Sequence, residues 1–144
     1  MTALSPRLFA SADAIRRIGR GLLARSLPRP EWTHDAHLAA TSWLVVERPD
    51  IDLDAELPGI IRRYNESVGG RNTDSEGYHE TITRVFLAAV RAHAAETEGQ
   101  DLCTRVNALL LSDRGRRDWP LRFYSPGLLF SVEARLSFVP PDLS

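Results

Sequence analysis

Residues 76–95, EGYHETITRVFLAAVRAHAA, carry the strongest secondary-structure signal in the chain. Apolar and histidine side chains recur there at spacings of three, four and seven residues, the period of one face of an α-helix. At the start of this stretch, Thr73 and Glu76 match a capping box, a reciprocal side-chain pair that starts many helices. The stretch therefore predicts a long amphipathic helix. Its inward face comprises His79, Ile82, Phe86, Ala89, Val90 and His93.

The same helical period appears in four further segments, and none of the chain sustains the alternation of a strand. The tail after residue 118 contains four prolines and predicts short helical turns and extended chain. We therefore predict an all-α, compact single domain of about five helices with an irregular Pro-rich C-terminal tail. The helical domain spans residues 31–144 and follows a basic helical extension, residues 1–30. The four additional helices are expected at 5–26, with Ser5 and Pro6 at its start, 33–46, with Thr33 as its cap, 54–68 and 100–112.

The first 30 residues are basic, with six arginines and one acidic residue, Asp13. An arginine-rich amphipathic start is typical of an organelle transit peptide or of a membrane-surface helix. A terminal helix docked on an acidic protein body gives the same pattern, and we favour that interpretation. Because no apolar run approaches the ~20 residues of a membrane-spanning helix, we expect no stable membrane insertion and a cytoplasmic location.

The chain contains 18 arginines and no lysine. Without lysine the chain cannot form a Schiff base or bind phosphate through a P-loop lysine, which excludes pyridoxal-phosphate chemistry and P-loop phosphoryl transfer. The single cysteine, Cys103, excludes an intramolecular disulfide and fits a cytoplasmic location. A basic segment, 114–117, precedes Trp119, but the net charge of −1 favours a solvated turn, so we expect no nucleic-acid partner.

The histidines are the one group of residues in the sequence whose spacing predicts a functional site. His34 and His37 lie three residues apart at the start of a predicted helix, a spacing at which two imidazoles can reach one metal ion. His79 lies at the start of another helix, on its apolar face. Where the two helix starts meet, the three rings would converge on one divalent transition metal. Three imidazoles suit zinc, iron, copper or nickel, and zinc and iron are the leading candidates.

Four polar residues near these histidines complete the predicted site. Glu80 is the candidate catalytic residue, which would move a proton to or from bound water or substrate. Tyr64, Asn65 and Tyr78 are candidate ligand-binding residues, because a hydroxyl or an amide can orient a ligand or hydrogen-bond the second ring nitrogen of a metal-bound histidine.

Three classes of function stay open at this point. The first is a small metal-dependent enzyme acting on a small molecule through the three-histidine site. The second is a metal-free protein that binds a small ligand, or performs acid–base chemistry, with the same residues. The third is a helical interaction module without enzymatic activity, in which the basic N-terminal helix contacts a partner or forms a homo-oligomer.

Six sequence blocks occur in a fixed order: WTHDAHL at 32–38, RYN at 63–65, NTD at 72–74, GYHETIT at 77–83, PLRFYS at 120–125 and VPPDL at 139–143. Together they resemble a family of small bacterial helical proteins without a settled activity, and GYHETIT is the most specific block. The resemblance covers about residues 31–143. It implies that His34, His37 and His79 belong to the shared pattern, and it supplies no mechanism.

Overall fold

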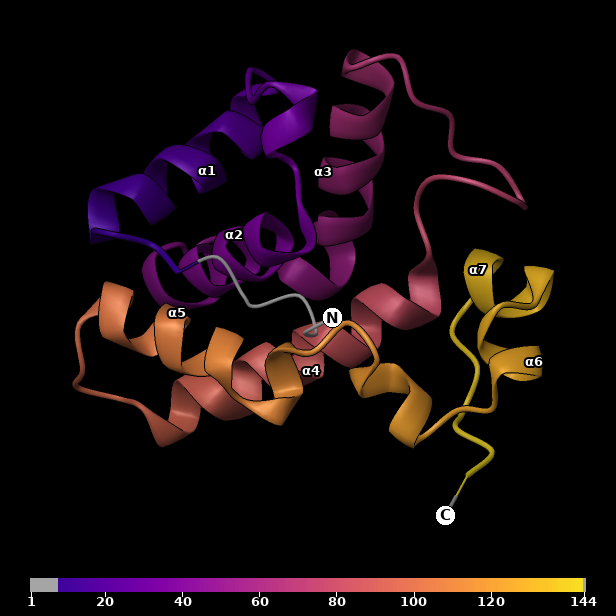
Figure 1. Ribbon diagram of the computed structural model, residues 1–144. Helices are drawn as coiled ribbons and strands as arrows, with labels where there is room; N and C mark the ends of the chain where they lie inside the picture. Colours follow the sequence, from indigo (N-terminus) through magenta and orange to yellow (C-terminus); the bar gives the residue numbers. More distant parts are fainter. Residues whose placement is uncertain (1–7, 144) are drawn as a thin grey trace, which may run out of the picture.

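The computed structural model describes residues 8–143, in which every regular element is helical (Figure 1). This confirms the all-α fold class. Two short α-helices and three 3₁₀ turns accompany the five helices of ten or more residues that build the body. Those five helices are α1 (Ala12–Ala24), α2 (His34–Glu47), α3 (Leu53–Ser67), α4 (Glu80–Glu96) and α5 (Leu102–Leu111).

Each of these five helices begins at a side chain that accepts a hydrogen bond from a backbone amide of the first turn. The predicted cap Thr33 does so for α2, through the amide of Ala36. The predicted start at Ser5 and Pro6 lies outside the described residues, and α1 begins at Ala12. The remaining caps are Ser11, Asp52, His79 and Asp101.

The start of α4 differs from the prediction. Thr73 Oγ1 does accept the amide of Glu76, at 3.2 Å, as in the predicted capping box. Gly77 then adopts a φ of 82°, which ends the local turn, and the helix starts three residues later at Glu80. A Cβ at position 77 would collide with the carbonyl oxygen of Arg71, so the backbone is folded tightly there. The segment before α4 is therefore a long, ordered loop.

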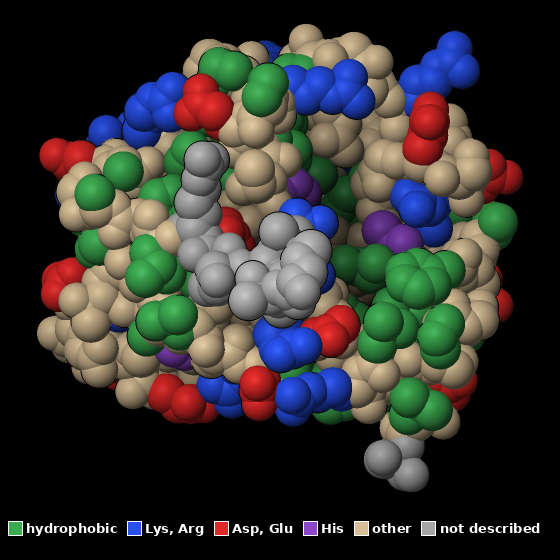
Figure 2. Space-filling view, viewed as in Figure 1, with side chains coloured by type: hydrophobic (Ala, Val, Ile, Leu, Met, Phe, Trp, Pro, Cys, Tyr) green, Lys and Arg blue, Asp and Glu red, His purple; other side chains and the backbone are tan. Residues whose placement is uncertain are grey.

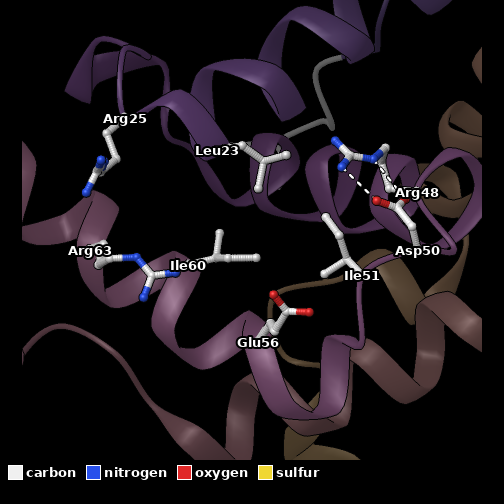
Figure 3. Close-up of a pocket in the computed structure, with 8 residues that line it drawn as sticks. All are labelled: Leu23, Arg25, Arg48, Asp50, Ile51, Glu56, Ile60 and Arg63. Carbon is white, nitrogen blue, oxygen red and sulfur yellow. Dashed lines mark hydrogen bonds and ion pairs between the residues drawn. The ribbon is translucent and has the colours of Figure 1, made fainter.

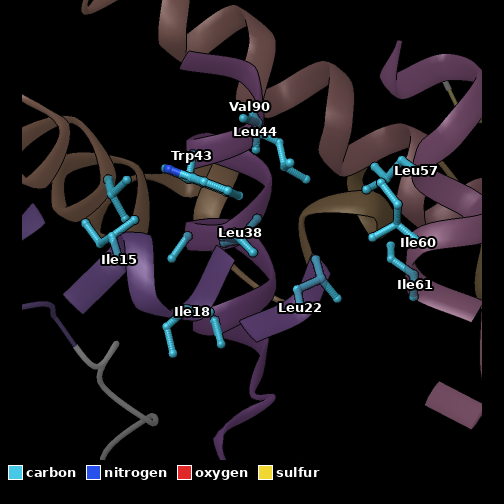
Figure 4. Close-up of a cluster of buried hydrophobic side chains, with 14 of the residues drawn as sticks. Ile15, Ile18, Leu22, Leu38, Trp43, Leu44, Leu57, Ile60, Ile61 and Val90 are labelled. Carbon is cyan, nitrogen blue, oxygen red and sulfur yellow. The ribbon is translucent and has the colours of Figure 1, made fainter. Parts of the chain in front are cut away.

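The main core surrounds α2, which packs against α1, α4 and α5 (Figures 1 and 4). Gly19 of α1 faces the ring of Trp43, which occupies the space that a Cβ at position 19 would need. The glycine thus allows the two helices to approach closely, which offsets its low helix propensity. Largest among the buried side chains in this core are Ile15, Leu22, Leu44, Leu57, Tyr64, Val90, Val106 and Leu109.

Helix α1 is docked on the body. This is the arrangement that we favoured for the basic N-terminal segment. Its apolar side contributes to the main core, and two of its arginines pair with acidic residues of the body. Arg16 contacts Glu47 at 2.9 Å, and Arg17 contacts Glu31 at 2.6 Å. The apolar side of the described N-terminal helix is therefore used within the chain. None of the helices in residues 8–143 is both long and apolar enough to cross a lipid bilayer.

The C-terminal segment is more regular than the predicted tail. It contains a 3₁₀ turn (Trp119–Arg122) and two short helices, α6 (Pro126–Leu129) and α7 (Val132–Leu136), which begin at Ser125 and Ser131. Both serines start turns in the sequence prediction too. A second apolar cluster joins this segment to α4, so it forms a cap on the end of the body (Figure 1). Its buried members are Tyr124, Leu129, Ala134 and Val139.

Candidate ligand-binding site

His79 uses both ring nitrogens within the protein. Its Nδ1 accepts the amide of Ile82 at 3.1 Å, so the ring proton lies on Nε2 and is donated to the carbonyl oxygen of Leu129 at 2.8 Å. Burial lowers the pKa of His79 below its ordinary value, and the charge of Arg135 adds to this effect. The residue therefore caps α4 and fastens the C-terminal segment to it as a neutral imidazole.

His34 also faces a backbone carbonyl. Its Nε2 lies 2.9 Å from the oxygen of Gly115, and its ring meets the edge of Phe86. Burial lowers the pKa of His34, and the charge of Arg117 lowers it further. This contact joins the start of α2 to the turn that follows α5.

The predicted three-histidine arrangement does not appear in the structure. Among residues 8–143, no three His, Cys, Asp or Glu side chains are grouped so that they could hold a metal ion. The physical reason is that each helix start meets a different neighbour: His34 contacts Gly115, whereas His79 contacts Leu129. In addition, both ring nitrogens of His79 are engaged with backbone groups, so neither is open to a metal ion.

The carboxylate of Glu80 is held on both oxygens. The Tyr78 hydroxyl donates to Oε1 at 2.6 Å, and Arg84 donates to Oε2 at 2.8 Å. Burial alone would raise the pKa of Glu80, but these hydrogen bonds and the charges of Arg84 and Arg62 keep it below the ordinary value. Glu80 is thus an ionised, paired carboxylate that orders the start of α4 and lines a cavity of about 610 Å³ beside Phe138.

Tyr64 and Tyr78 are also part of the packing. Tyr64 is fully buried, and its hydroxyl donates to the carbonyl oxygen of Leu27 at 2.8 Å. The ring of Tyr78 lies under the guanidinium of Arg62, 4.6 Å from its centroid. Burial, with the hydrogen bond to Glu80, raises the pKa of Tyr78 well above that of a free phenol. Both tyrosines are therefore neutral groups that fix neighbouring elements.

His37 differs from the other histidines. Its ring stacks on Trp32, with 3.7 Å between the centroids and 28° between the planes. Neither ring nitrogen is hydrogen-bonded to any group in the described chain, whereas His34, His79 and His93 each contact a backbone carbonyl. Burial lowers the pKa of His37 to about 3, and the charges of His34 and Arg117 contribute. The imidazole is therefore neutral, and its N–H donor and its acceptor nitrogen are both available to a ligand or to water.

His37 opens onto a pocket of about 510 Å³, which we call the Trp32 pocket. It lies between the start of α2, the end of α3 and the loop that leads to α4. Asn65 also lines it, so two of the predicted site residues share one pocket. The other lining residues are Arg29, Trp32, Val68, Gly69, Gly70, Arg71, Glu76 and Gly77.

The wall of the Trp32 pocket is organised by Asn72, which the sequence analysis did not single out as a site residue. Its Oδ1 accepts the Asn65 side-chain amide at 3.1 Å and the Tyr78 backbone amide at 3.0 Å. Its own amide group donates to the carbonyl oxygen of Arg62 and to Glu66. Asn72 thus ties the loop to α3 and to the start of α4.

Of the other lining residues, Trp32 offered the clearest sequence signal, because it stands five positions before His37. The sequence alone favoured a core or interface role for it. Arg29 and Arg71 carried no motif. Their roles depend on how the loop folds back over α3, which periodicity does not reveal.

A second pocket, of about 410 Å³, lies between α1, the α2–α3 turn and α3 (Figure 3). Arg25 and Arg63 point toward one side of it, and the ion pair of Arg48 with Asp50, at 2.9 Å, lies on the other. None of the site residues predicted from the sequence lines this pocket. Its apolar floor is formed by Leu23, Ile51 and Ile60.

Comparison of the chain with protein-family models, with curated proteins and with solved structures gives no match.

Proposed function

We propose that this chain is a metal-free small-molecule-binding protein whose ligand occupies the Trp32 pocket. The observation that carries the proposal is the neutral His37 ring, which lines the pocket and whose nitrogens bond no group among residues 8–143. The described chain has no fully buried side-chain nitrogen or oxygen without a partner, so the His37 nitrogens reach solvent in the pocket, where a ligand can replace water as their partner. The metal-dependent enzyme stays a prediction from the sequence.

Two arginines and one acidic residue, Glu76, line the pocket, and this balance favours a ligand with a small anionic group. Arg71 has no acidic partner in the described chain, and Arg29 makes one long contact, 3.4 Å, to the carbonyl oxygen of Val68. Guanidinium groups bind carboxylate and phosphate through paired N–H donors. Asn65 and His37 add neutral hydrogen-bonding groups on the same wall, so the pocket suits a compact carboxylate or phosphate ester.

The state of His37 favours binding over proton transfer. A general acid or base is most effective when its pKa lies near the working pH. With its pKa at about 3, His37 is almost entirely uncharged near neutral pH and is a weak base. It can still accept one hydrogen bond and donate another, which is what a binding wall requires.

Titration with benzoate, followed by ¹H–¹⁵N NMR, tests the proposal. We expect millimolar benzoate to shift the Trp32 indole and the Asn65 side-chain amide, and benzamide, which lacks the charge, to bind at least about tenfold more weakly. His37→Gln and Arg71→Gln should each weaken benzoate binding. His34→Gln is the matched control, because His34 contacts Gly115 and does not line the pocket.

Shifts that are absent, or spread evenly over the surface, would contradict the proposal. Zn²⁺ added in place of benzoate addresses the competing hypothesis. Saturable binding of one Zn²⁺ that His34→Gln, His37→Gln and His79→Gln all abolish would favour the metal site instead.

A further inference from the structure

The C-terminal cap exposes an unusual amount of apolar surface. Eight large hydrophobic side chains are exposed among residues 8–143, and six of them lie between residues 123 and 143. Single exposed apolar residues are common on protein surfaces, but a concentration of this kind marks an interaction site. We call the six residues the outer apolar face: Phe123, Phe130, Val132, Leu136, Phe138 and Leu143.

Helix α7 shows how this face is built. Val132 and Leu136 lie one turn apart on the same side of the helix and are 50% and 57% exposed. Ala134, on the opposite side, is fully buried against the body. The two large apolar residues thus point to solvent and the small residue points inward, the reverse of an ordinary surface helix.

The neighbouring segments follow the same pattern. Leu129 is buried in the second cluster, whereas the next residue, Phe130, is 64% exposed. The backbone amide of Leu143 donates to the carbonyl oxygen of Phe123, which places the end of the cap beside the backbone of Phe123. In the space-filling view, hydrophobic side chains gather at the lower right, where α6 and α7 lie in Figure 1 (Figure 2).

The exposure does not come from a loosely attached tail. Thr81 of α4 donates to the carbonyl oxygen of Ser137 at 3.0 Å and accepts the amide of Val139 at 3.1 Å. The Tyr124 hydroxyl donates to the carbonyl oxygen of Val139 at 2.6 Å. These bonds hold the cap in one conformation, so its outer face is a preformed surface.

We propose that the outer apolar face is a self-association surface, covered in solution by a second copy of this chain. Six side chains of this size, each 37–64% exposed, present on the order of 500 Å² of apolar surface. One partner of a stable interface contributes about 800 Å², of which about 65% is apolar in homodimers. The area is therefore close to what a symmetric dimer requires.

The charges near the face favour an identical partner. Arg122 pairs with Asp113 at 3.2 Å, and Arg135 of α7, which donates to the carbonyl oxygen of Gly77, is matched in number by Glu133 of the same helix, so the charges near the cap are close to balanced. A surface rim of one sign would favour an oppositely charged partner. A balanced rim allows two copies to meet about a two-fold axis without repulsion between like charges.

Sedimentation-velocity ultracentrifugation of the full chain over a range of concentrations tests the proposal. We expect a reversible dimer, and we expect Leu136→Glu to raise its dissociation constant more than about tenfold, because a charge would be buried in the interface. Leu111→Glu is the matched control: Leu111 is 67% exposed but lies on α5, outside the face, so its dimer should persist.

Phe130→Gln is a second variant of the face and guards against a folding defect in α7, with circular dichroism reporting the helical content of each protein. A wild-type chain that stays monomeric at all concentrations would overturn the proposal. So would a dimer that survives both face substitutions, or one that Leu111→Glu dissociates equally.

Discussion

His79 joins two segments of the chain that lie 50 residues apart. Its ring accepts one backbone amide and donates to one backbone carbonyl, so it links the first turn of α4 to Leu129. We predict that His79→Ala lowers the free energy of unfolding by about 2–4 kcal/mol, because it removes a helix cap and leaves a buried carbonyl unpaired. Urea denaturation measures this loss.

His79→Asn separates the two contributions. Asparagine caps a helix well but is too short to keep the bond to Leu129, so we expect about half of the loss seen with alanine. Equal losses for the two variants would show that capping by His79 adds nothing to stability.

Gly77 is constrained in two ways, by its φ of 82° and by the nearby Arg71 carbonyl. Gly69 shares the positive φ, at 86°, but has open space around it. We predict that Gly69→Ala costs about 1 kcal/mol, from backbone strain alone, and that Gly77→Ala costs at least about 2 kcal/mol. Thermal unfolding of both variants measures the difference.

Gly127→Ala is the neutral reference for these substitutions. Gly127 lies in α6 with nothing near the position of an added Cβ, so alanine there should leave stability unchanged or raise it slightly. If Gly77→Ala were as benign as Gly127→Ala, the tight turn at the Arg71 carbonyl would not exist in solution.

Residue-level prediction succeeded where a local rule applied. Thr33 and Ser131 were identified as helix starts because capping depends on a few neighbouring positions. The partners of His34 and His79 could not be predicted, because Gly115 and Leu129 are 81 and 50 residues away. Asn72 was likewise missed as an organising residue, because its four hydrogen bonds exist only once the loop is folded.

At the level of elements, the spacing of apolar residues located all five long helices, although α2, which the core surrounds, is buried on more than one side. It failed at the start of α4. The predicted hydrogen bond between Thr73 and Glu76 does form, but Gly77 then ends the turn, so the helix does not begin there. It also underestimated the C-terminal cap. Helices of four and five residues are too short to show a period, and they are stabilised by contacts with α4.

Attachment of the cap depends on Thr81, whose fully buried hydroxyl bonds both Ser137 and Val139. We predict that Thr81→Val, which keeps the shape but removes both bonds, speeds amide hydrogen exchange in residues 124–143 by at least about tenfold while α1 and α2 keep their protection. Thr104→Val is the control, because the Thr104 hydroxyl bonds Asp101 within its own helix start. Uniform acceleration over the whole chain would show that the cap does not open as a separate unit.

Across the whole molecule, three of the four histidines are embedded as neutral groups. Burial lowers the pKa values of His34, His37 and His79, and two of these rings join segments distant in the sequence. In the unfolded chain each would titrate near its ordinary value of about 6.5. Between the folded and unfolded pKa values the unfolded state binds more protons, so these residues make folding stability fall as the pH falls below about 6.5.

We predict that the free energy of unfolding is lower at pH 5 than at pH 7, with about 2 kcal/mol of the difference due to His37 alone, because its folded pKa of about 3 keeps it neutral throughout this interval. Urea denaturation at the two pH values measures the effect. His37→Gln should reduce the difference by about that amount, since glutamine does not titrate. Stability that is equal at both pH values, or greater at pH 5, would mean that the folded protein accommodates charged histidines. The proposal that a neutral His37 ring lines the Trp32 pocket would then be wrong.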